Sequence, residues 1–192
     1  MRTFQTIYSP GKVIYEIGND NKKIKKLIDN IEKVNNFKKE IETKETNFPS
    51  LKFNLIKGCN KFLCKRRYKI KNMVNDLHWK TVNLLCKNFN NIYIGKMSTK
   101  DIVKKHGNLA KSTKKYCYAL SHFTFRERLK SKAEEYKVNV KEVCEAYTSK
   151  TCGGCGKINK NLGSSKVFKC PTCSFKIGRD INGARNILIK HM

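Results

Sequence analysis

Acidic residues are scarce in this sequence. Its 192 residues include 15 Asp and Glu against 42 Lys and Arg, which gives a formal net charge of +27. A surface this basic attracts polyanions and repels cations, so nucleic acid is the expected partner. The charge alone leaves a second interpretation open, namely unspecific attachment to ribosomes or anionic lipid.

Long apolar runs are absent as well. No stretch approaches the roughly 18 apolar residues of a membrane span, and the first residues contain no apolar run of signal-peptide length. The sequence therefore predicts a soluble, intracellular protein without a membrane or a small-molecule substrate as its partner. The nine cysteines are an odd number in a reducing compartment, which argues against a disulfide framework. Metal binding better explains those that cluster.

The pattern of apolar and turn-forming residues predicts alternating strands and helices. We expect strands over Thr3–Ser9 and Val13–Ile17 around a Pro10-Gly11 turn, then a helix over Asn19–Glu45, a break at Thr46–Ser50 and a helix over Phe53–Phe89. Next come a strand at Ile92–Ile94, a basic connection over Lys100–Lys115 and a helix over Tyr116–Tyr136. A strand over Val138–Cys144 and a helix over Asp180–Ile189 complete the expected order. Strands separated by long helices imply right-handed crossovers and a mixed α/β sheet.

Apolar residues at helical spacing identify the expected core. The core-facing positions of the helices are Ile24, Leu27, Ile28 and Ile31; Ile70, Met73, Val74, Leu77, Thr81, Leu84 and Leu85; and Leu120, Phe123, Leu129 and Ala133. Trp79, His78 and His122 are also expected in the core, because histidines outside a ligand cluster more often pack than bind.

Four cysteines carry the strongest motif. Cys152 and Cys155 form one CxxC pair, Cys170 and Cys173 form another, and 14 residues separate the two pairs. Each pair makes a knuckle that aims two thiolates at one centre, so the two pairs predict a tetrahedral structural Zn²⁺ site in a zinc ribbon. An iron–sulfur cluster or a redox role is the weaker alternative. The other five cysteines are expected to be buried as small apolar residues.

Two carboxylates flank the cysteine motif. Asp180 is the single acid between Ala146 and Met192, and Glu145 directly precedes that stretch. Hydrolysis of a phosphodiester by two Mg²⁺ ions needs three or four converging carboxylates, and these two could supply part of that set. Asp180 could equally cap the helix that it opens. A third acid should come from a central strand, but Thr3–Ser9 contains none.

Longer segments around these residues resemble a known family. Tyr147–Gly156 and Arg179–Ile187 are similar to the C-terminal signature of the TnpB/Fanzor family, transposon-encoded RNA-guided DNA endonucleases. Arg2–Thr6, Asp76–His78 and Ser121–Phe123 resemble its eukaryotic and viral branch. The resemblance implies a RuvC-type, RNase H-like nuclease domain over 1–145 and 174–192, with a zinc ribbon inserted at 146–173. It further implies DNA and guide RNA as partners, and nuclear or viral-factory localisation.

The resemblance also implies which residues of this chain correspond to the family's three catalytic acids. The family's third catalytic acid matches Asp180, and its second aligns with Gly95-Lys96, where this chain has no acid. The Fanzor-like branch carries an alternative glutamate before the first zinc cysteine, which Glu145 matches. The first acid belongs just upstream of the segment that matches Arg2–Thr6. We therefore expect Glu145 and Asp180 to be catalytic Mg²⁺ ligands if the site is active, and these 192 residues alone to be inactive.

Basic residues provide candidate contacts to nucleic acid. Lys65, Arg66, Arg67, Lys69 and Lys71 form the densest patch, with a solvated helix face as the alternative. Arg179 and Arg185 flank Asp180 and could steady a phosphate or balance its charge. The sequence thus favours part of an RNA-guided nuclease of a transposable element. A non-catalytic zinc-ribbon protein that binds DNA or RNA, and a degenerate reading frame without function, are the alternatives.

Overall fold

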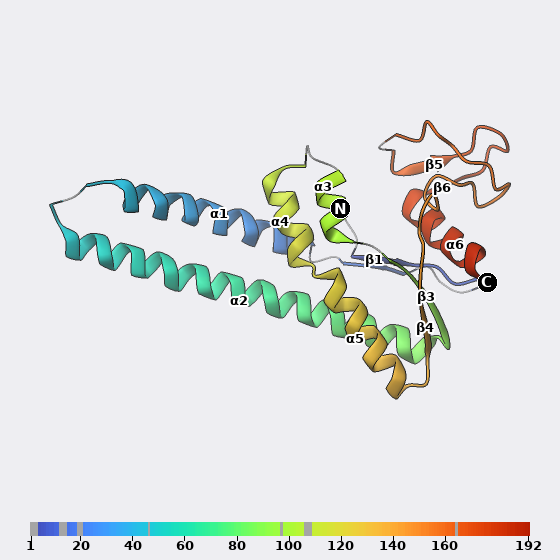
Figure 1. Ribbon diagram of the computed structural model, residues 1–192, viewed down its shortest axis with the longest axis horizontal. Helices are drawn as coiled ribbons and strands as arrows, with labels where there is room; N and C mark the ends of the chain where they lie inside the picture. Colours follow the sequence, from blue (N-terminus) through green and yellow to red (C-terminus); the bar gives the residue numbers. More distant parts are fainter. Residues whose placement is uncertain are drawn as a thin grey trace.

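The computed structural model describes residues 4–11, 15–18, 21–45, 47–96, 98–105, 109–163 and 165–192, which form a mixed α/β protein. The strands are β1 (Gln5–Ile7), β2 (Tyr15–Ile17), β3 (Asn91–Gly95), β4 (Asn139–Val143), β5 (Val167–Lys169) and β6 (Lys176–Gly178), and the helices are α1 (Asn21–Thr43), α2 (Pro49–Asn88), α3 (Thr99–Lys105), α4 (Lys111–Ala119), α5 (His122–Glu135) and α6 (Arg179–His191) (Figure 1).

Helices α1 and α2 lie side by side and form an arm that extends away from the strands (Figure 1). The expected apolar residues Ile24, Leu27 and Ile28 of α1 are all buried. Helix α2 starts earlier than predicted, because Pro49 stands in its first turn, where its missing N–H costs no hydrogen bond. None of the helices within the described ranges is long and apolar enough to cross a membrane.

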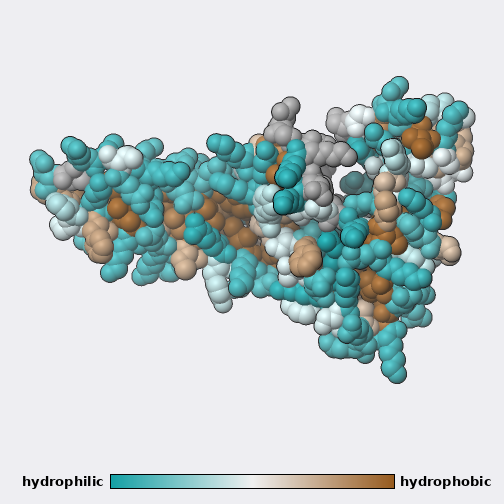
Figure 2. All heavy atoms as spheres, in the orientation of Figure 1, coloured by the Kyte–Doolittle hydropathy of each residue, from teal (hydrophilic) through white to brown (hydrophobic). Residues whose placement is uncertain are grey.

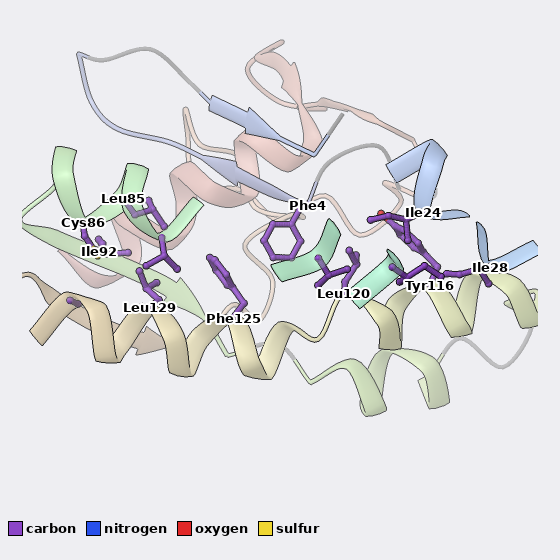
Figure 3. Packing of buried hydrophobic residues seen from close by; sticks show 14 of the residues in the cluster. Phe4, Ile24, Ile28, Leu85, Cys86, Ile92, Tyr116, Leu120, Phe125 and Leu129 are labelled. Atoms are coloured by element: carbon purple, nitrogen blue, oxygen red, sulfur yellow. The ribbon is translucent and has the colours of Figure 1, made fainter. Parts of the chain in front are cut away.

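The core of the wider end is built around Phe4. Its ring stacks between His78 and His122, at centroid distances of 5.3 and 5.2 Å, and meets the edge of Phe125 at 5.0 Å. Figure 3 shows Phe4 pointing toward Phe125, with Leu129, Leu85 and Ile92 beyond it. Both histidines are buried, which confirms that they pack in the core.

The strands pair in twos. β1 and β2 form the expected antiparallel hairpin, β3 and β4 pair in parallel with Asn91 opposite Asn139, and β5 and β6 pair antiparallel. The prediction of one mixed sheet is therefore not met within the described ranges, where three two-stranded sheets stand apart. The parallel β3–β4 pair is joined through α3, α4 and α5, as expected for a helical crossover.

Five expectations about the helices and the core were wrong. The basic connection at 100–115 contains α3 and the start of α4, and the helix expected over 116–136 is broken at Ser121, whose φ is 47°. The break shifts the register of α5, so Phe125 is buried and Phe123 is exposed. Trp79 is 43% exposed, because its neighbour His78 takes the core position. Of the five other cysteines, Cys64 and Cys144 are exposed rather than buried.

Candidate functional site

The four motif cysteines converge on one point. Their sulfur atoms all lie within 4.8 Å of one another, with Cys152 and Cys173 as well as Cys155 and Cys170 at 3.6 Å. A tetrahedral zinc with Zn–S bonds near 2.3 Å would hold its sulfurs about 3.8 Å apart, so the cluster fits a single ion with four sulfur ligands. A multinuclear iron–sulfur cluster would separate the thiolates further. Backbone N–H groups of Cys173 and Thr172 lower the pKa of Cys170 to about 6, which favours the thiolate that binds metal.

Two buried asparagines of α6 attach the cysteine unit, which we define as residues 151–178. Asn182 Oδ1 accepts a hydrogen bond from Gly153 N–H at 3.1 Å, and its Nδ2 donates to Thr151 O at 2.7 Å. Asn186 Nδ2 donates to Thr148 O and Thr151 O, at 2.8 and 2.7 Å. A side chain at Gly153 would meet Asn182 Oδ1 at 3.0 Å, a tight contact that favours glycine at this position. The motif therefore docks on the last helix through two asparagines that the sequence reasoning missed.

Glu145 stands at the carboxyl end of β4 and faces the end of β3. A Cβ atom added at Gly95 would overlap Glu145 Oε2 and would lie 3.0 Å from its Cδ. The carboxyl group of Glu145 therefore occupies the space that a side chain at position 95 would fill. Burial raises the pKa of this carboxyl, against the opposing effect of the Arg126 guanidinium. A half-buried acid with a raised pKa beside a cavity is typical of functional sites.

The local chain fixes the backbone at Glu145. Its carbonyl oxygen accepts hydrogen bonds from Thr148 N–H at 3.2 Å and Thr148 Oγ1 at 2.8 Å, which closes the turn after β4. One residue earlier, Cys144 O lies 3.1 Å from His191 Nε2 at the end of α6. The acid is therefore held between β4 and the last helix.

Asp180 is exposed in the first turn of α6. Gly178 is the N-cap, and no side chain caps this helix end, so Asp180 is not the cap that the sequence left as its alternative role. Glu145 and Ala184 line the same cavity. Asp180 precedes Ala184 by one turn, a rise of about 6 Å on the same side of the helix. Asp180 itself does not line the cavity with Glu145, so the convergence of the two acids stays a prediction.

The two arginines beside Asp180 contact the cysteine unit. Arg179 Nη1 donates to Gly163 O at 2.9 Å, and its backbone N–H donates to Lys166 O at 2.8 Å. The guanidinium carbon of Arg185 lies 5.5 Å from the centre of the Phe175 ring. These contacts hold the unit on α6, while a role toward phosphate stays a prediction.

The predicted basic patch lies on more than one side of α2. Lys65 and Lys69 are four residues apart, as are Arg67 and Lys71, but the two pairs are offset by two residues, or about 200° around the helix. Arg66 lies with its guanidinium carbon 4.8 Å from the Phe62 ring centre. The patch is therefore not the single face that a phosphate track requires.

Only one of these pairs lines a groove between the two helices of the arm. Arg67 and Lys71 share a hollow of about 540 Å³ with Lys38 and Asn35 of α1. Lys38 Nζ is fixed there by Asn60 Oδ1 at 2.8 Å. Figure 2 shows a largely hydrophilic surface on one face of the arm, with apolar residues along the seam between α1 and α2. The groove therefore presents basic groups from both helices.

Comparison with known proteins finds one matching family model and several similar sequences. Residues 122–187 match the family model described as "Cas12f1-like, TNB domain". TnpB-like proteins of Acanthamoeba polyphaga mimivirus are 35% identical over 194 residues, which is 98% of this chain and 35% of theirs. The CRISPR-associated endodeoxyribonuclease Cas12f1 of Sulfoacidibacillus thermotolerans is 33% identical over 73 residues, 38% of this chain and 17% of that protein. The chain thus spans about a third of the length of its viral relatives.

A solved structure supports the fold. A chain in the cryo-EM structure of the Cas12f1–sgRNA–target DNA complex matches with a TM-score of 0.53 and 19% identity, over 93% of this chain and 44% of that one. At this identity the likeness concerns the arrangement of helices and strands. It agrees with a mixed α/β fold over nearly all of the sequence.

Proposed function

Because the chain belongs to the TnpB family over the third of those proteins that it spans, we propose that it is the C-terminal nuclease part of a transposon-type RNA-guided DNA endonuclease. Its strands and helices would form a RuvC-type, RNase H-like domain, with a zinc ribbon inserted at residues 146–173. DNA and a guide RNA would be its partners.

The relation between Gly95 and Glu145 carries this proposal. The family's second acid is expected at position 95 or 96, and Glu145 places its carboxyl group in the space beside Gly95. A glutamate from the end of β4 would therefore replace an acid from the end of β3. The two strands are parallel neighbours, with Gly95 opposite Val143, so an acid at the end of either strand would lie at the same edge of the sheet.

Glu145 and Asp180 would hold Mg²⁺ in this scheme. Bound magnesium would supply an activated water and a counter-charge for the leaving oxygen. The half-buried carboxyl of Glu145 suits a hard cation, which prefers carboxylate oxygens. Two acids are fewer than such a site needs, and β1 contributes none. The 192 residues alone should therefore not cleave DNA.

The zinc would be structural. Four thiolates leave no open coordination position, and the asparagines of α6 attach the metal-bound unit to the helix that bears Asp180. Zinc binding would thereby fix the start of α6. The groove lined by Lys38, Arg67 and Lys71 would contact phosphates of nucleic acid, because it offers three cationic side chains from two helices.

A chimera tests the proposal. The matching third of a mimiviral TnpB-like protein is replaced by this chain, and cleavage of target DNA is measured with guide RNA and Mg²⁺. Cleavage should occur and should fall at least about 100-fold in Asp180→Asn and in Glu145→Gln, since each removes a metal ligand. The matched control is Asp76→Asn, an exposed acid of α2 that should leave the rate unchanged. A folded chimera that binds DNA without cleaving it would contradict the nuclease assignment.

That outcome would favour the second candidate, a non-catalytic zinc protein that binds nucleic acid. The exposure of Asp180 and the acid-free β1 are the observations on its side. In that case Arg67→Ala and Lys71→Ala would weaken binding of the chain to DNA or RNA, and the magnesium dependence would be absent.

A further inference from the structure

The turn that follows Glu145 holds one residue in an unusual backbone conformation. Tyr147 has a φ of 66°, in the left-handed region that residues with a Cβ atom adopt only at a cost. Within the described ranges, the other non-glycine residues with a positive φ are Ser121, Lys137 and Ser174, so Tyr147 is the one aromatic residue of this group. A bulky side chain keeps such a conformation where the surrounding structure imposes it, which is common at ligand-binding sites.

Hydrogen bonds to the backbone impose the conformation of Tyr147. Its carbonyl oxygen accepts bonds from Lys150 N–H, Thr151 N–H and Thr151 Oγ1, each at 2.9 Å. The next residue, Thr148, is buried, and its carbonyl oxygen accepts a bond from Asn186 Nδ2 of α6 at 2.8 Å. The turn is therefore anchored to the last helix, and the backbone of Tyr147 has little freedom to relax.

The side chain of Tyr147 takes no part in this anchoring. It is 67% exposed, and it makes no hydrogen bond or ring contact to the part of the chain that the structure describes. Other exposed aromatic rings are covered by a cation of the same chain: Trp79 by Arg128, Phe123 by Arg126 and Tyr136 by Lys132. The fold thus presents an aromatic ring on a fixed backbone, with the ring available to a ligand.

The position of Tyr147 indicates which ligand this would be. Glu145 lies two residues before it, and Cys152 of the metal cluster lies five residues after it. The surrounding segment is basic, with Asp180 as the single acid of residues 146–192. Such a segment attracts the phosphates of nucleic acid. A strand that approaches the Glu145 carboxyl along this segment would pass the Tyr147 ring.

We propose that Tyr147 is a stacking platform for one unpaired base of single-stranded DNA beside Glu145. An aromatic ring binds the π-face of any base, and one such contact raises affinity by about 5- to 150-fold. The bases of a duplex cover one another's faces, so the platform would select an unpaired strand. The fixed turn holds the ring in place before the DNA arrives, which reduces the entropy lost on binding. The choice of DNA as the ligand rests on the proposed function.

Binding of a short thymidine DNA strand to the zinc-loaded chain, without Mg²⁺, tests the proposal. Tyr147→Ala should weaken binding at least about 5-fold, and Tyr147→Phe, which keeps the ring, should bind within about 2-fold of the unsubstituted chain. Tyr118→Ala is the matched control, because Tyr118 is an exposed tyrosine of α4, and it should leave the affinity unchanged. The duplex of this strand with its adenosine complement should bind Tyr147→Ala and the unsubstituted chain equally.

Glycine at position 147 separates stacking from a structural role of the side chain. Tyr147→Gly removes the ring and the Cβ atom together, and glycine adopts a positive φ without a steric cost. Its melting temperature should equal or exceed that of the unsubstituted chain and lie about 2–4 °C above that of Tyr147→Ala. Both variants should nevertheless lose the same fraction of their single-strand affinity. A side chain that served the fold would instead lose stability and binding together.

Several results would overturn the proposal. One is unchanged single-strand affinity in Tyr147→Ala, and another is an equal loss of affinity for the duplex or in Tyr147→Phe. A Tyr147→Gly protein that melts below the unsubstituted chain would also count against it, because the ring would then stabilise the fold. None of these measurements involves cleavage. A chimera that cleaves DNA while binding stays insensitive to Tyr147 would refute the platform and leave the nuclease assignment standing.

Discussion

Replacing Asn182 by alanine should loosen the cysteine unit. This side chain is fully buried and bonds Gly153 N–H and Thr151 O. Thr151 O keeps its bond from Asn186, so the substitution orphans chiefly the Gly153 N–H. An orphaned buried donor costs about 1–3 kcal/mol, and the small cavity adds about 1 kcal/mol. The higher helix propensity of alanine returns about 0.5 kcal/mol. The net loss should be about 2 kcal/mol.

The assay combines urea unfolding of the zinc-loaded protein with amide exchange. Exchange should accelerate at residues 151–156 in Asn182→Ala, while the buried residues of α2 and α5 stay protected, because the hydrogen-bond partners of the asparagine, Gly153 and Thr151, lie outside both helices. Asn72→Ala is the matched control, since Asn72 is an exposed asparagine in the middle of α2. A change in Asn182→Ala below about 0.5 kcal/mol, or faster exchange spread over the whole protein, would refute the assigned role of this side chain.

Three further predictions follow from buried groups and from the metal. Burial lowers the pKa of His122 from 6.5 to about 4, so the unfolded state binds the extra proton. The contribution of His122 to stability is complete above pH 6.5 and falls by up to about 3 kcal/mol as the pH drops to 4. The slope in unfolding curves should become shallower in His122→Phe, and the part that remains should include that of buried His78, whose pKa burial also lowers. Chelation of the metal should abolish amide protection in β5 and β6 and leave α2 and α5 folded, as measured by exchange, since the two regions have separate cores. Gly95→Ala should destabilise the protein by about 1–2 kcal/mol, because the new methyl group overlaps the Glu145 carboxyl. In a double-mutant cycle, Glu145→Ala should remove that cost. Additive effects of the two substitutions on the free energy of unfolding would contradict the contact.

The sequence predicted best those features that depend on neighbouring residues. Two CxxC pairs define their knuckles locally, and the four sulfurs meet as expected. The hairpin of β1 and β2 around Pro10-Gly11 and the strand that ends at Gly95 also follow from local patterns. Such signals are read from short segments, because the turn residues and the alternation of side chains are sufficient to specify them.

Features that depend on distant contacts were not predictable in this way. Ser121 adopts a positive φ without being glycine, so no residue type indicates the break between α4 and α5. Trp79 is exposed, with the Arg128 guanidinium carbon 5.3 Å from its ring centre, because the adjacent His78 bonds Leu120 O inside the core. Asn182 and Asn186 look like ordinary surface residues until the loop that they bind is placed against them.

The candidate acids illustrate the same distinction at the functional site. Spacing along the chain cannot relate Gly95 to Glu145, which are 50 residues apart, but the parallel pairing of β3 and β4 brings their backbones to the same edge. Glycine is the one residue that leaves room there for a neighbour's carboxylate. A side chain at position 95 and the carboxyl group of Glu145 would therefore compete for the same space. Where an expected acid is missing from a motif, the space around that position, rather than the sequence next to it, indicates which acid to test as its replacement.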